Sequence, residues 1–236
     1  MIQFQGIRKR FGAVQVLDGI DLTIRSGRVT AIVGPNSAGK TTLIKTMLGL
    51  TSSDEGVVVI DGTVTDREGA YRAGIGYMPQ IARYPENLSG ADLFAMMADL
   101  RRMTARDVEL IESLGLHDHL EKPLRVLSGG TRQKINAALA FLFAPAILIL
   151  DEPTAGLDPA SSAVLKDKIR AEQARGRTFI VTSHVMSELE EVSDDIALLV
   201  EGRIRFSGPV VDLKRLTRQL SLERAVASFI EGGLAA

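Results

Sequence analysis

The stretch GPNSAGKTT, residues 34–42, lies between two apolar segments and decides how the rest of the chain is interpreted. It follows VTAIVG (29–34), whose β-branched residues predict a buried strand, and it leads into KTTLIKTMLGL (40–50), which has helical spacing and ends near a glycine. The stretch matches the pattern G-x-x-x-x-G-K-[ST], in which glycines let the backbone turn its N–H groups toward phosphate oxygens. Because a strand precedes the loop and a helix follows it, we predict a phosphate-binding loop here.

Each residue of this loop is predicted to contact a bound nucleotide. The ammonium of Lys40 is expected to reach the β- and γ-phosphates, and the hydroxyl of Thr41 is expected to ligate Mg²⁺. The alternative, a glycine-rich turn without a ligand, leaves the flanking strand and helix unexplained. The predicted nucleotide-binding residues of the loop are Gly34, Pro35, Asn36, Ser37, Ala38, Gly39, Lys40, Thr41 and Thr42.

A second motif, ILILDEP (147–153), places two acids at the end of an apolar strand. Open α/β sheets bind ligands at the carboxyl ends of their strands, so Asp151 is a candidate Mg²⁺ ligand. Glu152 follows directly and is a candidate general base for a water that attacks the γ-phosphate. Without the phosphate-binding loop, the same pair would be interpreted as two solvated loop acids.

The composition describes a folded protein without a strong charge bias. Of the 236 residues, 45% are hydrophobic and 24% are charged, which supports a sizeable core. The formal net charge of −1 argues against nucleic acid as the main partner. The absence of cysteine excludes disulfides and thiolate metal sites. The longest apolar run, AALAFLFAPAILIL (137–150), is shorter than the roughly 20 residues of a spanning helix, and no secretory signal is predicted.

Predicted strands and helices alternate along most of the chain. Strands that are separated by helices indicate a parallel α/β sheet. The block from about 85 to 145 contains no convincing strand, so we predict an inserted helical subdomain there. The predicted strands are 29–34, 56–62, 74–80, 147–153, 178–183, 195–200 and 202–208, and helical spacing covers 40–50, 88–120, 132–143 and 210–231.

The segment LSGGTRQ (127–133) identifies a family. Together with the phosphate-binding loop, ILILDEP, AGLD (155–158) and TSHV (182–185), it resembles the nucleotide-binding subunit of ABC transporters over nearly the whole chain. The resemblance implies an α/β fold: a P-loop NTPase (RecA-like) core with a small antiparallel β subdomain and an inserted α-helical subdomain. It also implies one nucleotide-binding domain over 1–236, with the helical subdomain at about 85–145 and a short helical tail at about 210–236.

The resemblance assigns roles to four further positions. Phe11 lies where the family stacks an aromatic ring on adenine, although a core residue is the alternative. Gln80 matches the glutamine that contacts Mg²⁺ and the γ-phosphate. His184 matches the switch histidine at the γ-phosphate. Asp158 matches an acid at the interface between two subunits.

The same resemblance assigns Ser128, Gly129 and Gly130 to the signature turn, which opens a helix and binds the γ-phosphate held by a second subunit. Three residues depart from the common pattern. Ser37 replaces a glycine, which is tolerated unless that position needs a positive φ. Thr131 replaces a glutamine, and Phe11 replaces a tyrosine. No departure removes a predicted metal ligand or the predicted base, so we expect an enzyme that hydrolyses ATP with Mg²⁺.

One chain carries one phosphate-binding loop and one signature turn, so the resemblance implies a head-to-tail pair of subunits, as a homodimer or with a paralogue. A membrane-spanning permease subunit is the second implied partner. It would hold this chain at the cytoplasmic face of the inner membrane, although the chain is expected to be soluble alone. The segment IARYPENLSG (81–90) is predicted to receive the permease, with Tyr84, Pro85, Glu86 and Leu88 as candidate contacts, or else to be an ordinary surface loop.

Within the family, the sequence is most similar to ATPases of the drug- and copper-processing type. These include the NosDFY type, a transporter that supports assembly of the copper centre of nitrous-oxide reductase. That similarity implies a NosY-like permease and a periplasmic NosD-like protein. Two alternatives stay open: an ABC ATPase that acts on ribosomes or DNA, and a regulatory cassette that binds ATP without hydrolysing it. Cargo and transport direction are not predicted.

Overall fold

The computed structural model describes residues 1–65 and 69–233, which form parts of two compact units. The first unit comprises Met1–Arg72 and Ile180–Ala236, and the second comprises Ala73–Phe179. Strand β8 (Thr178–Thr182) and the short 3₁₀ helix η1 (Ala70–Gly74) run across the division. The single domain predicted over 1–236, with its subdomain bounds, stays a prediction.

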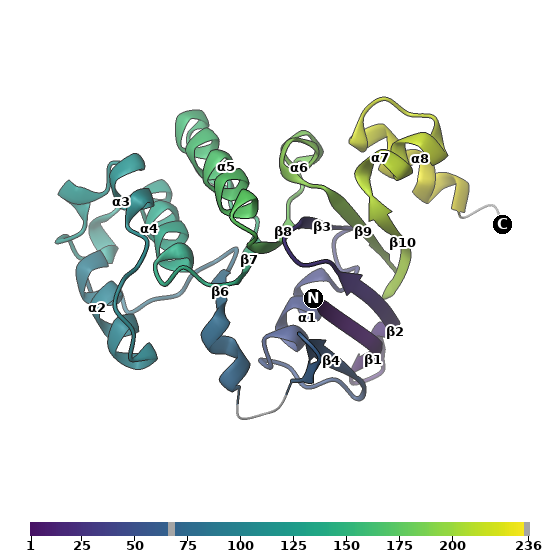
Figure 1. The fold of residues 1–236 in the computed structure, drawn as a ribbon, viewed down its shortest axis with the longest axis horizontal. Helices are drawn as coiled ribbons and strands as arrows, with labels where there is room; N and C mark the ends of the chain where they lie inside the picture. The colour runs from purple at the N-terminus through teal and green to yellow at the C-terminus, as the bar shows by residue number, and fades with distance from the viewer. Residues whose placement is uncertain (66–68, 234–236) are drawn as a thin grey trace. The chain divides into compact units, whose positions relative to one another are not determined.

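The first unit contains an antiparallel sheet with the strand order β2-β1-β4-β5 (Figure 1). One face of its central strand is buried, since Ile2, Phe4 and Ile7 are at most 2% exposed. The register of β1 against β2 shifts between Phe4 and Ile7, around the positive φ of Gly6. The strands are β1 (Ile2–Phe11), β2 (Val14–Ile24), β4 (Glu55–Ile60) and β5 (Thr63–Val64).

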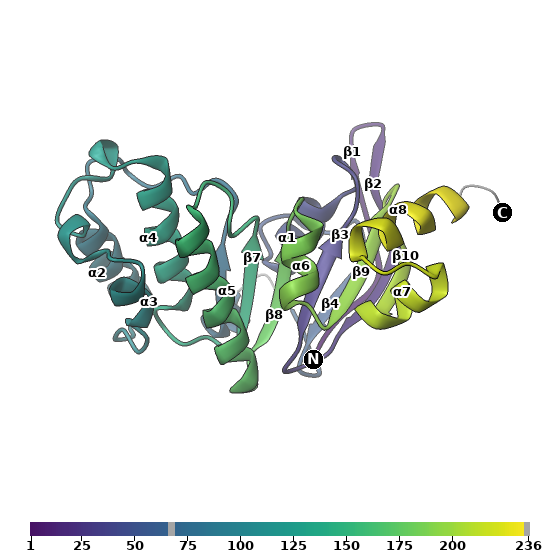
Figure 2. The ribbon, with the colours of Figure 1, turned by 90° about the horizontal axis from the view of Figure 1, so that it is seen from above.

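The same unit contains a second group of strands, in which β9 lies between β3 and β10. The β3–β9 pair is parallel and the β9–β10 pair is antiparallel. Helices α7 and α8 lie together beside β10 (Figure 2). The rings of Phe206 on β10 and Phe229 on α8 meet edge to face, with their centroids 5.8 Å apart. The elements are β3 (Val29–Val33), α1 (Lys40–Met47), α6 (Met186–Val192), β9 (Asp195–Val200), β10 (Arg203–Pro209), α7 (Val210–Thr217) and α8 (Leu222–Gly233).

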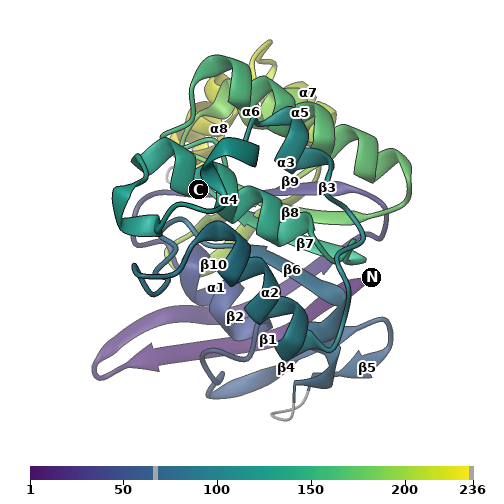
Figure 3. The ribbon, with the colours of Figure 1, turned by 90° about the vertical axis from the view of Figure 1, so that its left-hand side faces the viewer.

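The second unit pairs two parallel strands, β6 and β7, and also contains the helices α2 to α5, which Figure 3 labels. Strand β7 is buried at every residue, as its unbroken apolar sequence predicts. The elements are β6 (Ile75–Met78), α2 (Gly90–Arg101), α3 (Glu109–Ser113), η2 (His117–His119), η3 (Leu124–Val126), α4 (Gly129–Phe141), β7 (Ile147–Asp151) and α5 (Pro159–Ala174).

The observed elements confirm the predicted α/β class, and the differences have local causes. Helix α4 begins at Gly129, three residues before the predicted 132, because the Ser128 side chain accepts a hydrogen bond from the Thr131 N–H and caps the helix. The helical spacing over 88–120 resolves into α2, the short α3 and one 3₁₀ turn. Within the described residues, 85–145 contains no named strand, although Ser89 and Pro123 form one isolated bridge.

A buried lysine joins two parts of the second unit. Lys168 of α5 is 3% exposed, and its ammonium lies 2.7 Å from Asp107 Oδ2, 2.7 Å from Glu109 Oε2 and 3.2 Å from Glu172 Oε1. The same ammonium lies 6.0 Å from the ring centroid of Phe141. The Lys168 cluster therefore ties Asp107 and the first residue of α3 to α5 through a buried ammonium, which Glu109 reaches from the surface.

The pKa values of Lys168 and Glu172 shift in the directions that keep both groups charged. Burial alone would lower the pKa of Lys168, but hydrogen bonds to Asp107 and Glu109 outweigh it and raise the pKa. Burial alone would raise the pKa of Glu172, but Lys168 and Arg175 lower it. The Lys168 contribution is thus lost as pH rises through its raised pKa, and the Glu172 contribution is lost as pH falls through its lowered pKa.

Lys168→Met is expected to lower the free energy of unfolding by about 3–5 kcal/mol, because three carboxylates lose a buried cation. Urea unfolding at neutral pH measures the change. The matched control is Arg170→Gln on the same helix, where the exposed pair with Asp167 predicts a change within about 0.5 kcal/mol. Equal effects of the two substitutions would contradict a structural role for the Lys168 cluster.

Candidate active site

The predicted phosphate-binding loop joins β3 to α1 in the first unit, and its glycines are required by close packing. A Cβ atom on Gly34 would lie 1.9 Å from the carbonyl oxygen of Leu199 on β9. A Cβ atom on Gly39 would lie 2.8 Å from both Val16 O and Leu17 Cδ2 on β2, and Gly39 has a φ of 106°. Side chains at either position would displace backbone, so only glycine lets the loop pass between these strands.

The N-terminus of α1 is open to a ligand. Gly39 is its N-cap and supplies no side-chain hydrogen bond, so the first turn presents backbone N–H groups and the positive end of the helix dipole. Lys40 Nζ donates to the carbonyl oxygens of Gly34 and Pro35 at 2.6 and 3.0 Å. Both acceptors belong to the loop itself, so the ammonium is held where phosphate oxygens of a ligand would lie.

Ser37 occupies a backbone conformation that favours glycine. Its φ is 65°, so this position does have the positive φ at which a serine is tolerated less well than the usual glycine. An L-residue in this region costs about 1–2 kcal/mol relative to the right-handed region. The Ser37 hydroxyl donates to the carbonyl oxygen of Asn36 and gives the strained turn a local hydrogen bond.

Phe11 is not a core residue, which excludes the alternative interpretation of that position. Its side chain is 52% exposed, and the Lys9 ammonium lies 5.4 Å from its ring centroid. Phe11 pairs with Val14 across the β1–β2 turn, and two residues further along β2 Val16 lies against Gly39. An exposed aromatic face and the phosphate-binding loop are therefore connected by one short stretch of strand.

His184 follows β8 and is exposed in the first unit, whereas the two acids lie in the second. Asp151 ends β7 and Glu152 follows it directly, and the two residues are 6% and 8% exposed. Glu152 has a φ of 54°, a conformation that costs about 1–3 kcal/mol and is often found at functional sites. Burial, followed by the nearby charge of Asp151, raises the pKa of Tyr77 to about 12. Tyr77 is a neighbour of Asp151 that the sequence analysis did not identify.

The predicted signature turn is the exposed N-terminus of α4. Ser128 and Gly129 are exposed, and Ser128 Oγ accepts from the Thr131 N–H at 3.1 Å. The hydroxyls of Ser128 and Thr131 lie 2.9 Å apart, so threonine in place of the usual glutamine contributes to the cap. A Cβ on Gly130 would lie 3.0 Å from the carbonyl oxygen of Gly156, which brings the turn beside the segment that carries Asp158.

Asp158 is engaged within its own unit. It caps α5 by accepting from Ser161 N at 2.8 Å and from Ser161 Oγ at 2.7 Å, and its Oδ2 lies 3.1 Å from Lys134 Nζ. The Ser161 hydrogen bonds, followed by Lys134, hold the pKa of Asp158 well below its usual range. For Asp158 to contact a second subunit, it would have to do so in addition to its contacts with Ser161 and Lys134. The sequence did not reveal Lys134 on α4 as a partner of Asp158.

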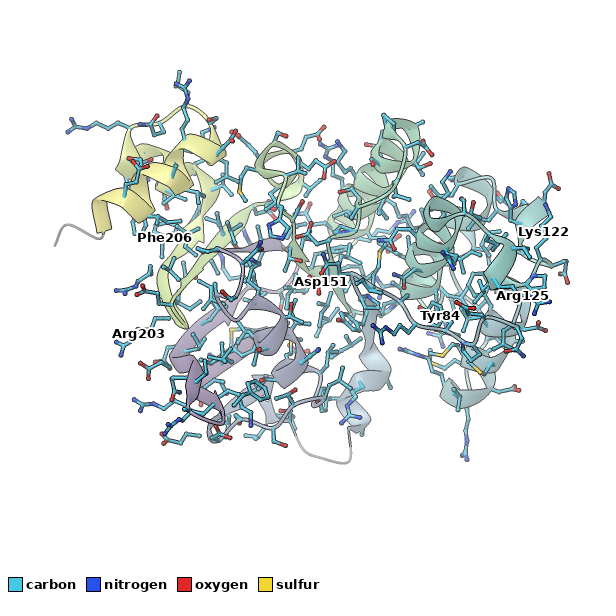
Figure 4. The ribbon with its side chains drawn as sticks, turned by 180° about the vertical axis from the view of Figure 1, so that it is seen from behind. Tyr84, Lys122, Arg125, Asp151, Arg203 and Phe206 are labelled. Atoms are coloured by element: carbon cyan, nitrogen blue, oxygen red, sulfur yellow. The ribbon has the colours of Figure 1, made fainter. Side chains whose placement is uncertain are left out.

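Gln80 is exposed, and a buried asparagine fixes the segment around it. Asn136 of α4 is 1% exposed, donates from Nδ2 to Pro79 O at 3.0 Å, and accepts from the Tyr84 hydroxyl at 2.9 Å. Burial raises the pKa of Tyr84 to about 12, so the phenol stays protonated and donating. Figure 4 labels Tyr84 and Asp151 within the second unit. Both ends of the Gln80 segment are thus anchored to the helix that carries the signature turn.

The Tyr84 contact changes one expectation. Its hydroxyl faces Asn136 rather than a partner, whereas Pro85 and Glu86 are exposed and Leu88 is partly buried. A polar residue in the apolar run INAALAFLF was the available signal for Asn136, because a buried amide requires partners.

Ser37→Gly is expected to raise the free energy of unfolding by about 0.5–1 kcal/mol, because the relief of positive-φ strain exceeds the added entropy of the unfolded chain. Thermal or urea unfolding measures the change. Ser37→Ala keeps the strain and serves as the control, with a smaller effect than glycine. A less stable glycine variant would contradict the inferred strain.

Asn136→Leu is expected to destabilise the protein by about 1–3 kcal/mol for each partner left without a hydrogen bond, Pro79 O and the Tyr84 hydroxyl. Tyr84→Phe in the same background removes one of the two orphaned groups. A double-mutant cycle in urea should therefore give a coupling of about 0.5–3 kcal/mol between the positions. Simple additivity of the two substitutions would contradict the inferred hydrogen bond between Asn136 and Tyr84.

Comparison with known proteins agrees with these motifs. The family model described as ABC transporter matches residues 17–155. The daunorubicin resistance ATP-binding protein DrrA3 of Streptomyces coeruleorubidus is 36% identical over 92% of this chain and 70% of its own length. The Nod factor export ATP-binding protein I of Azorhizobium caulinodans is 37% identical over 85% of this chain. The matched region spans 64% of that relative's length.

A solved structure, described as the ATP binding subunit of an ABC transporter, superposes with a TM-score of 0.91. The match covers 98% of this chain and 99% of that chain at 26% identity, so the fold is the α/β cassette with its antiparallel β subdomain and helical subdomain. The phosphate-binding loop, the acids after β7 and the signature turn all lie within residues covered by these matches. The chain belongs to the ABC transporter family and is one of its ATPases.

Proposed function

We propose that this chain is the ATP-hydrolysing subunit that energises an ABC exporter. The observation that carries the proposal is the glycine-lined loop, in which Gly34 and Gly39 pack against backbone while Lys40 Nζ is held by the loop carbonyls beside the first turn of α1, which no side chain caps. Relatives named for daunorubicin resistance and Nod factor export support export as the direction.

In this proposal, Lys40 exchanges its two loop carbonyls for oxygens of the β- and γ-phosphates. The exchange replaces neutral acceptors by charged ones, and charge-assisted hydrogen bonds are roughly twice as strong. The N–H groups of the loop and of the first turn of α1 add further donors. The exposed ring of Phe11 supplies an apolar face for adenine.

The residues assigned to Mg²⁺ offer the oxygen donors that this hard cation prefers: the Thr41 hydroxyl, the Asp151 carboxylate and the Gln80 amide oxygen. A bound Mg²⁺ would neutralise charge on the phosphates. Glu152, held at its positive φ, accepts the proton of the attacking water, and His184 donates a hydrogen bond to the γ-phosphate.

The exposed signature turn supports a two-subunit site. One chain has one phosphate-binding loop and one turn of Ser128–Gly130, so a second cassette completes each site in a head-to-tail pair. The γ-phosphate would be contacted from both subunits and would hold them together until hydrolysis removes it. Identical subunits are the simplest form of this pair.

A membrane-spanning permease is the partner that converts the closing and opening of the pair into transport. No helix within residues 1–65 and 69–233 has both the length and the apolar content of a membrane span. The proposal places the chain at the cytoplasmic face of the inner membrane through that permease. A narrower prediction is that the transporter supports assembly of the copper centre of nitrous-oxide reductase, with NosY-like and NosD-like partners. The names of the relatives described above do not support this narrower prediction.

An ATPase that acts on ribosomes or DNA is the alternative class. Affinity purification from cells separates the two classes: recovery of a multi-span membrane protein supports the exporter subunit, and recovery of ribosomes without one supports the alternative.

Glu152→Gln is expected to lower ATP hydrolysis by about 10²–10⁴-fold while ATP binding is kept, because only the proton acceptor is lost. The variant should form a stable ATP-bound dimer, which size-exclusion chromatography with ATP and Mg²⁺ detects. Lys40→Ala is the matched control that should lose tight ATP binding and therefore stay monomeric. An ATP-independent elution volume for Glu152→Gln, or unchanged ATP affinity for Lys40→Ala, would contradict the assigned roles.

A further inference from the structure

The C-terminal end of helix α1 is held by a side chain from outside the helix. Helix α1 has 8 residues, so it is only about 12 Å long. The carbonyl oxygens of its last turn need hydrogen-bond partners, and Lys45 O accepts from Leu50 N at 2.9 Å. Met47 O accepts from the Tyr71 hydroxyl at 3.0 Å. A side chain of the turn η1 therefore satisfies the end of the helix whose first residue is Lys40.

Apolar packing holds one face of α1 but is weak beside Tyr71. The side chains of Leu43 and Met47 are fully buried and fix that apolar face. A cavity of about 560 Å³ borders the end of the helix, where its lining includes Thr46, Gly49 and Tyr71. Atoms that line a cavity have few van der Waals partners on that side. The hydrogen bond from Tyr71 is therefore a directed contact at a place where packing contributes little.

The guanidinium of Arg72 occupies a space that two glycines leave open. A Cβ atom on Gly49 would lie 2.8 Å from Arg72 Nη2 and 2.8 Å from the Tyr71 hydroxyl oxygen. A Cβ atom on Gly69 would lie 2.8 Å from both Nε and Nη1 of Arg72. The same guanidinium lies 5.7 Å from the ring centroid of Tyr71. Arg72 thus places a cation at the C-terminus of α1, where it stabilises the negative end of the helix dipole.

The position of Arg72 is not explained by its own hydrogen bonds. Within the described residues, its Nε atom is buried and has no hydrogen-bond partner, and its guanidinium makes no salt bridge. A buried N–H group without a partner costs free energy. The contacts with the end of α1 and with the ring of Tyr71 are what hold the guanidinium there.

We propose that Tyr71 and Arg72 are positioning residues for nucleotide binding: they hold the C-terminal end of α1, so that the N–H groups of its first turn point at the phosphates. Hydrogen bonds weaken steeply as their angle departs from linear. In a rod of about two turns, a displacement of the last turn also redirects the first. The inference rests on the proposed ATPase function and adds two residues that lie outside the phosphate-binding loop.

Titration of the full chain with a fluorescent ATP analogue tests the proposal. Tyr71→Phe keeps the ring and removes the hydrogen bond to Met47 O, so the dissociation constant is expected to rise about two- to tenfold. The fraction of chain that binds at saturation should stay at the wild-type value. In ATP hydrolysis, KM should rise by a similar factor while kcat is kept. A substitution that only unfolds part of the sample would lower the bound fraction and kcat and leave the dissociation constant and KM unchanged.

The matched control is Thr217→Val at the end of α7, in the same unit. It removes a hydroxyl that donates to Leu213 O at 2.8 Å, so it also deletes one bond from a side chain to a helix carbonyl. Because α7 carries no predicted nucleotide contact, the dissociation constant should stay at the wild-type value.

A second pair of variants tests the cation. Arg72→Gln should raise the dissociation constant, and Arg72→Lys should recover part of the affinity because a positive charge stays near the end of α1. Arg224→Gln on α8, where the residue is exposed, makes the same change in net charge. It should leave the dissociation constant within about twofold of the wild-type value.

Thermal unfolding verifies that each variant folds. The proposal would be overturned if Tyr71→Phe left the dissociation constant unchanged, if Thr217→Val raised it equally, or if Arg72→Gln raised it no more than Arg224→Gln. Failure of the wild-type chain to bind the analogue would refute the proposed function itself. Wild-type binding that the Tyr71 and Arg72 substitutions do not weaken would refute only the positioning role.

Discussion

The hydrogen bonds along the first two turns of α4 are the constraint on which the second unit depends. Asn136 binds the segment before Gln80, and Lys134 binds the acid at the start of α5. Gln133 Nε2 lies 3.5 Å from the carbonyl oxygen of Glu152, at the limit of a hydrogen bond. One helix thus contacts three candidate catalytic segments, so a displacement of α4 would be felt by all of them.

The sequence was sufficient to predict the elements whose physics is local. The strand before the phosphate-binding loop is apolar except for Thr30 and is followed by Gly34. The strand before Asp151 is apolar over 147–150, and Pro153 lies two residues after Asp151. Helical spacing alone predicted a start of α4 at 132, because two glycines have poor helix propensity, whereas the resemblance placed the opening of the helix at Ser128–Gly130, where the Ser128 cap lies. Propensity alone is therefore a weak guide where a side-chain cap starts the helix.

What could not be predicted depends on contacts between distant residues. Nothing near Lys168 in the sequence indicates that Asp107 and Glu109 will surround it, since a lysine on a helix is usually solvated. The positive φ of Ser37 was only a condition in the sequence, suggested by the glycine that the family has at this position, because a serine itself carries no signal of backbone conformation. Ser37 and Glu152 show that strain lies at both predicted phosphate-facing segments, where the surrounding fold holds conformations that an isolated peptide would avoid.

The exposed ring at position 11 has a spectroscopic consequence. The chain contains no tryptophan, so a Phe11→Trp variant would carry a single indole, placed on the strand pair that reaches Gly39. The ammonium of Lys9 already lies over this ring face, and an indole binds cations more strongly than a phenyl ring. Under the proposed stacking of adenine on this ring, emission from that one fluorophore would follow nucleotide binding in real time, without a label on the nucleotide.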